Sequence, residues 1–275
     1  MKKISVITIN YNDKVGLEKT IKSVLDQTAT NFEFVIIDGK STDGSTKIIE
    51  NYKSKIDYWI SEKDSGVYNA MNKGIKNAEG EFVIFMNSGD VFNNKNVLTD
   101  VTKYLTPNFD IYYGDNYKIK ADGKRKKTYP SQLSFSFFYN SSINHQSTFI
   151  RKDLFEKHFY YNENYKIVSD WEFFIYTICK INVPYKYLPI TICDYDFTGI
   201  SSLAKYQHIA QYEKMTTIKK FFPLFENDYK QLAEVNSKRI QQILHIRNHK
   251  IAWKILKIFT SIIQLFLPKF KQDNQ

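Results

Sequence analysis

The segment from Asp64 to Asp90 constrains the fold of this chain more than any other. It reads DSGVYNAMNKGIKNAEGEFVIFMNSGD, which is an acidic turn, an amphipathic helix, an apolar strand and a second acidic turn. Apolar residues recur at helical spacing over 65–78, and the strand at 81–87 is too continuously apolar to have a solvent-exposed face. A buried strand reached through a crossover helix predicts an α/β fold with a mostly parallel central sheet, in which this strand is a central parallel one.

Acidic residues follow three predicted strands at the point where each strand ends. Asp38, Asp64 and Asp90 each come after such a strand. In an open parallel sheet, ligands bind beyond the carboxyl ends of the strands. A single aspartate there is often only a turn former or a helix cap, but three on one edge favour a binding site.

The rest of the chain also reads as alternating elements. A first strand at 4–10 leads to a helix capped near Asp13, and Asp43 lies in a segment rich in capping residues. We interpret Asp43 as a helix cap and not as a ligand contact. Later elements are expected in this order: a helix at 96–104, a strand at 111–113, a basic turn at 122–125, a strand entering a helix over 144–155, and a helix over 165–178.

Composition favours a folded protein in a reducing compartment. Of the 275 residues, 43% are hydrophobic, which is enough for a large core, and the two cysteines, Cys179 and Cys193, are too few for a disulfide framework. The first residues turn polar before a signal-peptide core could form, and no apolar run is long enough to span a bilayer. We therefore expect a cytoplasmic protein, peripheral on the inner face of the plasma membrane if it is membrane-bound.

The basic excess of the chain is mostly C-terminal. Formal net charge is +10, and residues 203–275 carry 13 Lys and Arg against 5 acids. Within them, 251–267 predicts an apolar helix with one polar stripe, and basic residues across 247–271 would suit an anionic membrane surface. The alternative is packing on the domain or on a second copy of the chain, as a homodimer. We place a first domain at 1–202 and a helical extension at 203–275.

The absence of common phosphate-binding motifs narrows the chemistry. No GxGxxG follows the first strand, and neither a P-loop nor an HExxH sequence occurs. A dinucleotide-binding enzyme or a P-loop NTPase would need such a motif to bind the phosphates of its ligand, so the sequence argues against both classes. Carboxylates at an open α/β edge suit instead a hard divalent cation that bridges to the phosphates of a ligand.

Four motifs in order resemble those of the family 2 glycosyltransferases: VITINYN, FEFVIIDGKSTDGS, ISEKDSGVYNAMNKGI and GEFVIFMNSGD. The resemblance covers about residues 3–202 and is specific, because all four motifs fall at compatible spacings. It implies a GT-A-type nucleotide-sugar fold with additional C-terminal helices. It is closest to bacterial enzymes that build capsule, O-antigen or exopolysaccharide repeats.

The resemblance implies a nucleotide pocket at the first strand ends. Thr8, Asn10 and Tyr11 would line this pocket at the end of the first strand. Asp38 would accept hydrogen bonds from the uracil or the ribose, and Asp64 would be the next nucleoside contact.

Ser88, Gly89 and Asp90 occupy the place of the family's Asp-x-Asp motif, and Asp90 is the residue expected to hold Mn²⁺ or Mg²⁺ against the diphosphate. The first acid of that motif is a serine in this chain. A single protein carboxylate makes a weaker metal site, which diphosphate oxygens and water would have to complete.

Asp170 in the VSDWE segment matches the family's catalytic base, which takes the proton of the acceptor hydroxyl. Glu172 is the second choice, because two residues further along a helix its side chain points elsewhere. His145 in NHQS resembles a family position near the donor phosphates or the acceptor, although a lone histidine is as often a structural hydrogen bonder. The segment 197–202 resembles a flexible Gly-Ser segment that closes over the donor, or it is a plain loop.

The sequence thus predicts an inverting, metal-assisted hexosyl- or N-acetylhexosaminyltransferase. It would move a sugar from a nucleotide-sugar donor, expected to be UDP-linked, to a hydroxyl of a glycan or a lipid-linked acceptor. A nucleotidyltransferase is the enzymatic alternative, but its basic Gly-rich loop near the first strand is missing. A basic nucleic-acid-binding protein and a non-catalytic sugar-binding module are the others, and we expect no nucleic acid partner.

Overall fold

The computed structural model describes residues 2–120, 122–196 and 203–268. The chain divides into two units, Met1–Phe222 and Pro223–Gln275, which are described separately. We expected the boundary near residue 203, but the long helix α8 (Gln207–Phe221) belongs to the first unit. The predicted Gly-Ser segment at 197–202 lies outside the described residues.

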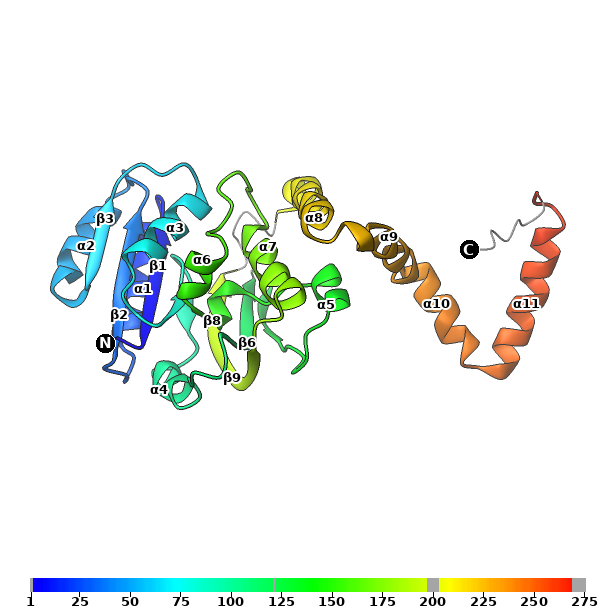
Figure 1. The fold of residues 1–275 in the computed structure, drawn as a ribbon, viewed down its shortest axis with the longest axis horizontal. Coiled ribbons are helices and arrows are strands. Elements are labelled where there is room, and N and C mark those ends of the chain that lie inside the picture. The colour runs from blue at the N-terminus through cyan, green and yellow to red at the C-terminus, as the bar shows by residue number, and fades with distance from the viewer. Residues whose placement is uncertain (1, 121, 197–202, 269–275) are drawn as a thin grey trace. The chain divides into compact units, whose positions relative to one another are not determined.

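The first half of the first unit follows the predicted alternation of strands and helices (Figure 1). Its elements are β1 (Ile4–Asn10), α1 (Lys14–Leu25), β2 (Phe32–Asp38), α2 (Ser45–Tyr52), β3 (Tyr58–Ser61), α3 (Val67–Asn77) and β4 (Phe82–Phe85). β1 pairs in parallel with β2 on one side and with β4 on the other, and β2 pairs in parallel with β3. The predicted parallel α/β sheet is therefore confirmed for this half.

The second half mixes strand directions. Its elements are β5 (Val91–Phe92), α4 (Val97–Thr102), β6 (Ile111–Lys120), β7 (Gly123–Lys127), α5 (Phe135–Asn140), β8 (Thr148–Arg151), α6 (Asp153–Lys157), α7 (Ser169–Ile175) and β9 (Tyr185–Asp196). Within the described residues one sheet runs in the order β3-β2-β1-β4-β8-β6-β9-β5, with β7 attached to β6. Since β8 is antiparallel to both β4 and β6, β4 is parallel to a neighbour on one side only, which corrects our expectation for that strand.

Both faces of the central strands are covered, as their apolar runs predict. On one face, α1 buries Leu17, Ile21 and Val24 in a core shared with alternate residues of β1, β2 and β4. On the other face α3 approaches so closely that a Cβ at Gly74 would lie 2.4 Å from the side chain of Ile7. A larger residue at position 74 would push α3 away from the sheet.

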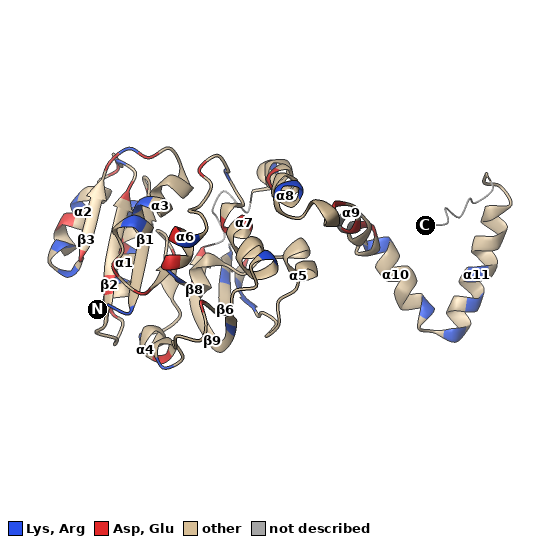
Figure 2. Cartoon of the chain, in the orientation of Figure 1, with Lys and Arg blue, Asp and Glu red and all other residues tan. Residues whose placement is uncertain are grey.

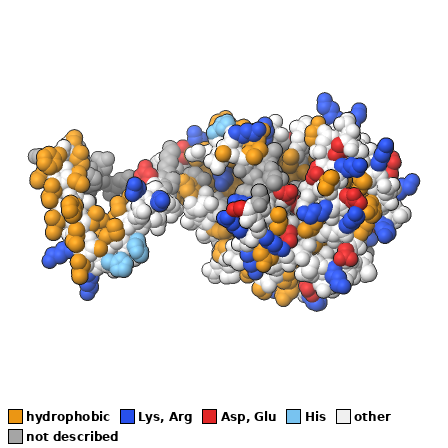
Figure 3. Space-filling model, turned by 180° about the vertical axis from the view of Figure 1, so that it is seen from behind, with side chains coloured by type: hydrophobic (Ala, Val, Ile, Leu, Met, Phe, Trp, Pro, Cys, Tyr) orange, Lys and Arg blue, Asp and Glu red, His pale blue; other side chains and the backbone are white. Residues whose placement is uncertain are grey.

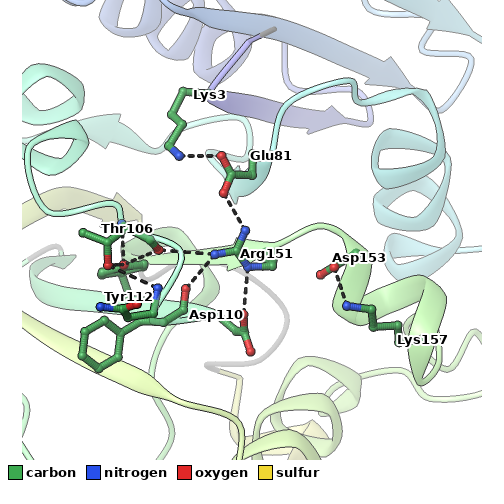
Figure 4. Close-up of polar contacts among 10 residues, drawn as sticks. Lys3, Glu81, Thr106, Asp110, Tyr112, Arg151, Asp153 and Lys157 are labelled. Atoms are coloured by element: carbon green, nitrogen blue, oxygen red, sulfur yellow. Dashed lines mark hydrogen bonds and ion pairs between the residues drawn. The ribbon is translucent and has the colours of Figure 1, made fainter.

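Arg151 joins the two halves of the sheet at the edge opposite the strand ends that carry the acids (Figure 4). It ends β8 and forms ion pairs with Glu81, which precedes β4, and with Asp110, which precedes β6. Lys3 adds a second cation to Glu81. Burial raises the pKa of Glu81, but hydrogen bonds from Lys3 and Arg151 outweigh this and hold that pKa below its usual value.

The second unit contains α9 (Glu226–Val235), α10 (Lys238–Arg247) and α11 (Lys250–Gln264). Apolar side chains cover much of the surface of α11, where Ile251 is 79% exposed and Phe259 60% exposed (Figure 3). Lysines interrupt this apolar surface (Figure 2). No helix within the described residues is long and apolar enough to cross a membrane.

Candidate functional site

A cavity of about 780 Å³ opens where the carboxyl ends of β1, β2, β3, β4 and β9 meet. This is the edge at which the sequence places its acids. Most of the predicted site residues line the cavity: Asn10, Tyr11, Asp64, Ser88, Asp90, His145 and Asp170. Asn10 and Asp170, 160 residues apart in the chain (170 − 10), thus reach one space, as the predicted topology requires.

Thr8, Asp38 and Gly89 do not line the cavity. Thr8 is fully buried and donates to the carbonyl oxygen of Met86 at 2.7 Å, which ties β1 to β4. Asp38 is also fully buried, and hydrogen bonds from Asn10, Ser41 and Ser61 occupy both its carboxylate oxygens. It supports Asn10 from behind and orders the following loop, whereas we expected it to contact the nucleoside.

Gly89 has a structural position in the turn between Ser88 and Asp90. Its φ of +94° lies in the region that favours glycine, and its N–H donates to Thr20 Oγ1 at 3.0 Å. The turn therefore needs glycine to aim Asp90 at the cavity.

Ser88 takes the place of an acid for a reason visible in its contacts. Its hydroxyl donates to Asn10 Oδ1 at 2.8 Å, while Asn10 Nδ2 donates to Asp38 at 2.7 Å. The amide of Asn10 is thereby oriented with its oxygen toward residue 88. A carboxylate at that position would face this oxygen without a proton to share, so a hydroxyl fits better.

Tyr11 and Asp64 form the rim on the side of β2 and β3. Tyr11 is 68% exposed, and its ring can offer an aromatic face to a ligand in the cavity. A Cβ at Gly39 would lie 2.4 Å from Asp64 Oδ2. Glycine at position 39 is therefore what allows the Asp64 carboxylate to stand at the cavity wall.

Asp90 is only 3% exposed, yet it lines the cavity from the turn after β4. Burial raises its pKa to about 7, although the backbone N–H of Asp196 donates to Oδ1 at 2.9 Å. A buried carboxylate of this kind fits a hard divalent cation, which would offset the cost of its charge. Within the described residues no three His, Cys, Asp or Glu side chains form a metal site, so diphosphate oxygens and water would have to complete the coordination.

Asp170 lies in the first turn of α7 and faces the cavity, as its position before an apolar helix predicts. Its Oδ2 lies 2.8 Å from Nδ1 of His145, and Tyr68 donates to Oδ1 at 3.3 Å. Nε2 of His145 lies 3.2 Å from Nδ2 of Asn87. We assign the His145 proton to Nδ1, which then donates to Asp170 while Nε2 accepts from Asn87 Nδ2. Asn87 Oδ1 is buried and has no partner among the described residues.

Glu172, the second choice for a base, does not reach the cavity. It is 1% exposed on the buried side of α7, and burial raises its pKa. Lys220 lies 3.9 Å away, which is at the limit of an ion pair. The helical geometry that separates it from Asp170 is as predicted.

The sequence did not reveal that α8 holds the loop that leads to the base. Glu213 of α8 is 5% exposed and accepts the backbone N–H groups of Lys166, Ile167 and Val168 at 2.6 to 3.1 Å. These residues come just before Asp170. Because α8 is only weakly amphipathic, its sequence does not predict that Glu213 is buried, and no sequence pattern predicts which backbone N–H groups a buried glutamate will bind.

Lysines and residues from the end of β9 also line the cavity and were not predicted. Lys63 and Lys166 supply positive charge to it, and Tyr195 and Asp196 reach it from the end of β9. Asp196 follows the same rule as the other acids, since it ends a strand. It was missed because β9 itself was not predicted.

Comparison with known proteins gives a consistent result. The family model described as "Glycosyl transferase family 2" matches residues 5–164, more than half of the chain. An uncharacterized glycosyltransferase of Mycobacterium tuberculosis is 31% identical over 210 residues, which cover 72% of this chain and 77% of that protein. The poly(ribitol-phosphate) beta-N-acetylglucosaminyltransferase TarS of Staphylococcus aureus is 32% identical over 138 residues, 48% of this chain and 23% of TarS.

Among solved structures, residues 1–349 of S. aureus TarS in complex with UDP-GlcNAc superimpose with a TM-score of 0.64 at 21% identity. The match covers 84% of this chain and 70% of that one. At this identity the likeness concerns the fold, and it agrees with the α/β sheet and flanking helices described above.

Proposed function

This chain belongs to glycosyl transferase family 2, and we propose that it is an inverting enzyme that moves a sugar from a UDP-linked donor to a hydroxyl of a cell-surface glycan or a lipid-linked acceptor. The observation that carries the proposal is that two carboxylates, those of Asp90 and Asp170, line the same cavity although they come from different parts of the chain. One carboxylate is placed to hold a cation at a diphosphate, and the other to accept a proton. Membership of the family sets aside the nucleotidyltransferase and nucleic-acid-binding alternatives.

The proposed reaction is a single displacement. Asp170 accepts the proton of the acceptor hydroxyl while the hydroxyl oxygen bonds to the anomeric carbon. The bond from that carbon to the diphosphate breaks, its electron pair leaves on the nucleoside diphosphate, and the configuration inverts. A divalent cation at Asp90 would neutralise charge on the leaving group. His145 holds the Asp170 carboxylate in place and is a positioning residue in this scheme.

The choice of donor rests on chemistry and on relatives. TarS is described as an N-acetylglucosaminyltransferase, and its structure was solved with UDP-GlcNAc. An N-acetylhexosamine or hexose on UDP is therefore the first donor to test. The exposed ring of Tyr11 would stack on the base, and Lys63 and Lys166 would add positive charge near the diphosphate.

Nucleotide release from UDP-, GDP- and dTDP-sugars, with and without Mn²⁺, tests this proposal directly. Hydrolysis of a UDP-sugar that requires both metal and Asp90 would establish donor and site. Donor binding is measured in parallel by calorimetry, because a missing acceptor can suppress turnover. If no sugar nucleotide binds, the proposal is wrong.

We also propose that α11 places the protein peripherally on the anionic inner face of a bacterial plasma membrane. Support comes from its exposed apolar side chains together with Lys250, Lys254 and Lys257 on the same helix. The protein should sediment with phosphatidylglycerol vesicles and less with phosphatidylcholine vesicles, and a Lys254→Glu, Lys257→Glu variant should lose this preference. A stable homodimer with no vesicle binding would assign the apolar surface to a second copy instead.

A further inference from the structure

The carboxylate of Asp170 receives hydrogen bonds on both of its oxygens. Oδ1 accepts the backbone N–H of Trp171 at 2.9 Å and the hydroxyl of Tyr68 at 3.3 Å. Oδ2 lies 2.8 Å from Nδ1 of His145. Each carboxylate oxygen has two lone pairs, so the contacts within the described residues fill Oδ1 and leave one lone pair of Oδ2 open.

Tyr68 lines the cavity although it is only 5% exposed. Burial, and after it the negative charge of Asp170, raises the pKa of Tyr68 well above its usual value, although backbone N–H groups of Ser169 and Asp170 act to lower it. The hydroxyl therefore keeps its proton at neutral pH. It is a hydrogen-bond donor to the carboxylate and does not compete with it as a base.

The helix that carries Tyr68 is fixed to the segment that leads to α7. Asn72 of α3 is 3% exposed, and its amide donates to the carbonyl oxygen of Tyr161 at 2.8 Å and accepts the N–H of the same residue at 3.0 Å. Asn69 and Asn72 also donate to the carboxylate of Glu163, at 2.8 and 2.9 Å. These bonds set the start of α3 against the chain that enters the helix of the base.

Packing fixes the Tyr68 ring as well as its helix. The ring centroid lies 5.7 Å from that of Tyr161, which is itself 2% exposed. On the side of the sheet, Gly74 lets α3 lie directly against Ile7. The hydroxyl thus reaches Asp170 from a side chain whose position is set by buried contacts.

Tyr68 and His145 are the two donors that reach the carboxylate from other elements, since the Trp171 N–H belongs to the same helical turn as Asp170. Without the Tyr68 hydroxyl, a lone pair would be open on each oxygen, and an incoming hydroxyl could approach either one. The 3.3 Å distance is long for a bond between two oxygens, but such bonds often shorten when the substrate binds.

We propose that Tyr68 is a positioning residue for Asp170, which occupies Oδ1 and so presents the open lone pair of Oδ2 to the acceptor hydroxyl. The inference rests on the proposed transferase function and adds to it a residue and the atom that receives the proton. The proton of the hydroxyl moves to Oδ2 while the hydroxyl oxygen bonds to the anomeric carbon. The electron pair of the broken bond leaves on the nucleoside diphosphate, and Tyr68 keeps its own proton throughout.

A double-mutant cycle on the full chain tests this role. UDP release from UDP-GlcNAc is measured with Mg²⁺ and with water as the acceptor, in wild type, Tyr68→Phe, Asp170→Asn and the double variant. Tyr68→Phe keeps the ring and should lower kcat about tenfold, with the donor KM within about twofold of wild type. In the Asp170→Asn background the same substitution should change kcat less than about twofold, because the carboxylate through which it acts is gone.

Tyr112→Phe is the matched control. Tyr112 is also fully buried and its hydroxyl bonds to Thr106, but it does not line the cavity. Loss of its hydroxyl should change kcat less than about twofold in either background. A tenfold loss from Tyr68→Phe in both backgrounds would show a general structural role and overturn the inference, as would an unchanged kcat with Asp170 intact.

The cycle also separates this inference from the proposed function. If calorimetry shows that the wild type prefers another sugar nucleotide, the cycle is run with that donor and the same outcomes apply. A wild type that cleaves no sugar nucleotide contradicts the proposed function. A wild type that cleaves its donor as fast as Tyr68→Phe contradicts only the role of Tyr68.

Discussion

Nδ1 of His145 lies 2.8 Å from Oδ2 of Asp170, and both side chains are less than one fifth exposed at the cavity wall. The contact fixes the direction in which Asp170 can accept a proton. We predict that Asp170→Asn lowers the transfer rate by about 10²- to 10⁴-fold, because the amide cannot act as a base. Donor affinity, measured by calorimetry, should stay within about twofold of wild type. Asp100→Asn is the control, because Asp100 is a partly exposed aspartate on α4 that pairs with Lys103.

Substitution of His145 tests its role in positioning Asp170. His145→Ala should lower kcat by about 10- to 100-fold with a smaller effect on the donor KM, because the base loses its orientation. His145→Asn can place an N–H near the position of Nδ1 and should recover part of the loss. A kcat for the asparagine variant no higher than that of the alanine variant would contradict a positioning role.

Removal of the Asp90 carboxylate should reduce the extent to which a divalent metal ion increases the affinity for the nucleotide. Mg²⁺ or Mn²⁺ is expected to tighten UDP binding to the wild type, and in Asp90→Asn this gain should fall by roughly 10- to 100-fold. Calorimetric titrations with and without EDTA measure the gain. If metal tightens UDP binding equally in both proteins, Asp90 is not its ligand.

Neutralisation of Glu213 should loosen the loop before the base. In Glu213→Gln the amide group opposes backbone N–H donors, so we expect a loss of about 2–3 kcal/mol in the free energy of unfolding, together with a lower kcat. Urea unfolding and turnover are measured on the same preparation. Glu234→Gln, an exposed residue of α9, should change neither quantity. A stability loss without any change in kcat would limit Glu213 to folding.

Acid stability should depend on Glu81. Since its pKa is lowered in the folded protein, its ion pairs stabilise the fold above the unfolded-state value of 4.5, and this contribution is lost as the pH falls through the folded-state pKa. Glu81→Gln should therefore cost about 1–2 kcal/mol at pH 7 and show a weaker loss of stability below pH 4.5. Chemical unfolding across this pH range, with the exposed Glu79→Gln as control, measures the difference.

The sequence predicted the first half of the fold well because each strand and helix there has a strong periodicity of its own. It also predicted that Asp64, Asp90 and Asp170 would meet, since their positions at strand and helix ends fix where they lie. The resemblance to the family supplied His145. These predictions depend on local pattern and on the geometry of parallel sheets.

The remainder depends on contacts that local pattern does not encode. β9 was missed because Pro189 lies within it, a residue that argues against a strand in the sequence, and because its register with β6 shifts between Gly114 and Asn116. Asp38 does not line the cavity because the hydroxyl groups of Ser41 and Ser61 donate hydrogen bonds to its carboxylate oxygens. The pairing of β9 with β6 and the hydrogen bonds from Asn10 and Ser61 to Asp38 join residues that are distant in the chain.

The ion pairs of Arg151 also bear on how such enzymes can be recombined. Glu81 belongs to the half with the nucleotide loops, and Arg151 and Asp110 belong to the half with the acceptor side. In a chimaera joined anywhere between residues 86 and 109, Glu81 would come from one parent, whereas Asp110 and Arg151 would come from the other. Parents that both keep an acid at 81 and arginine at 151 could exchange acceptor halves without separating the two walls of the cavity.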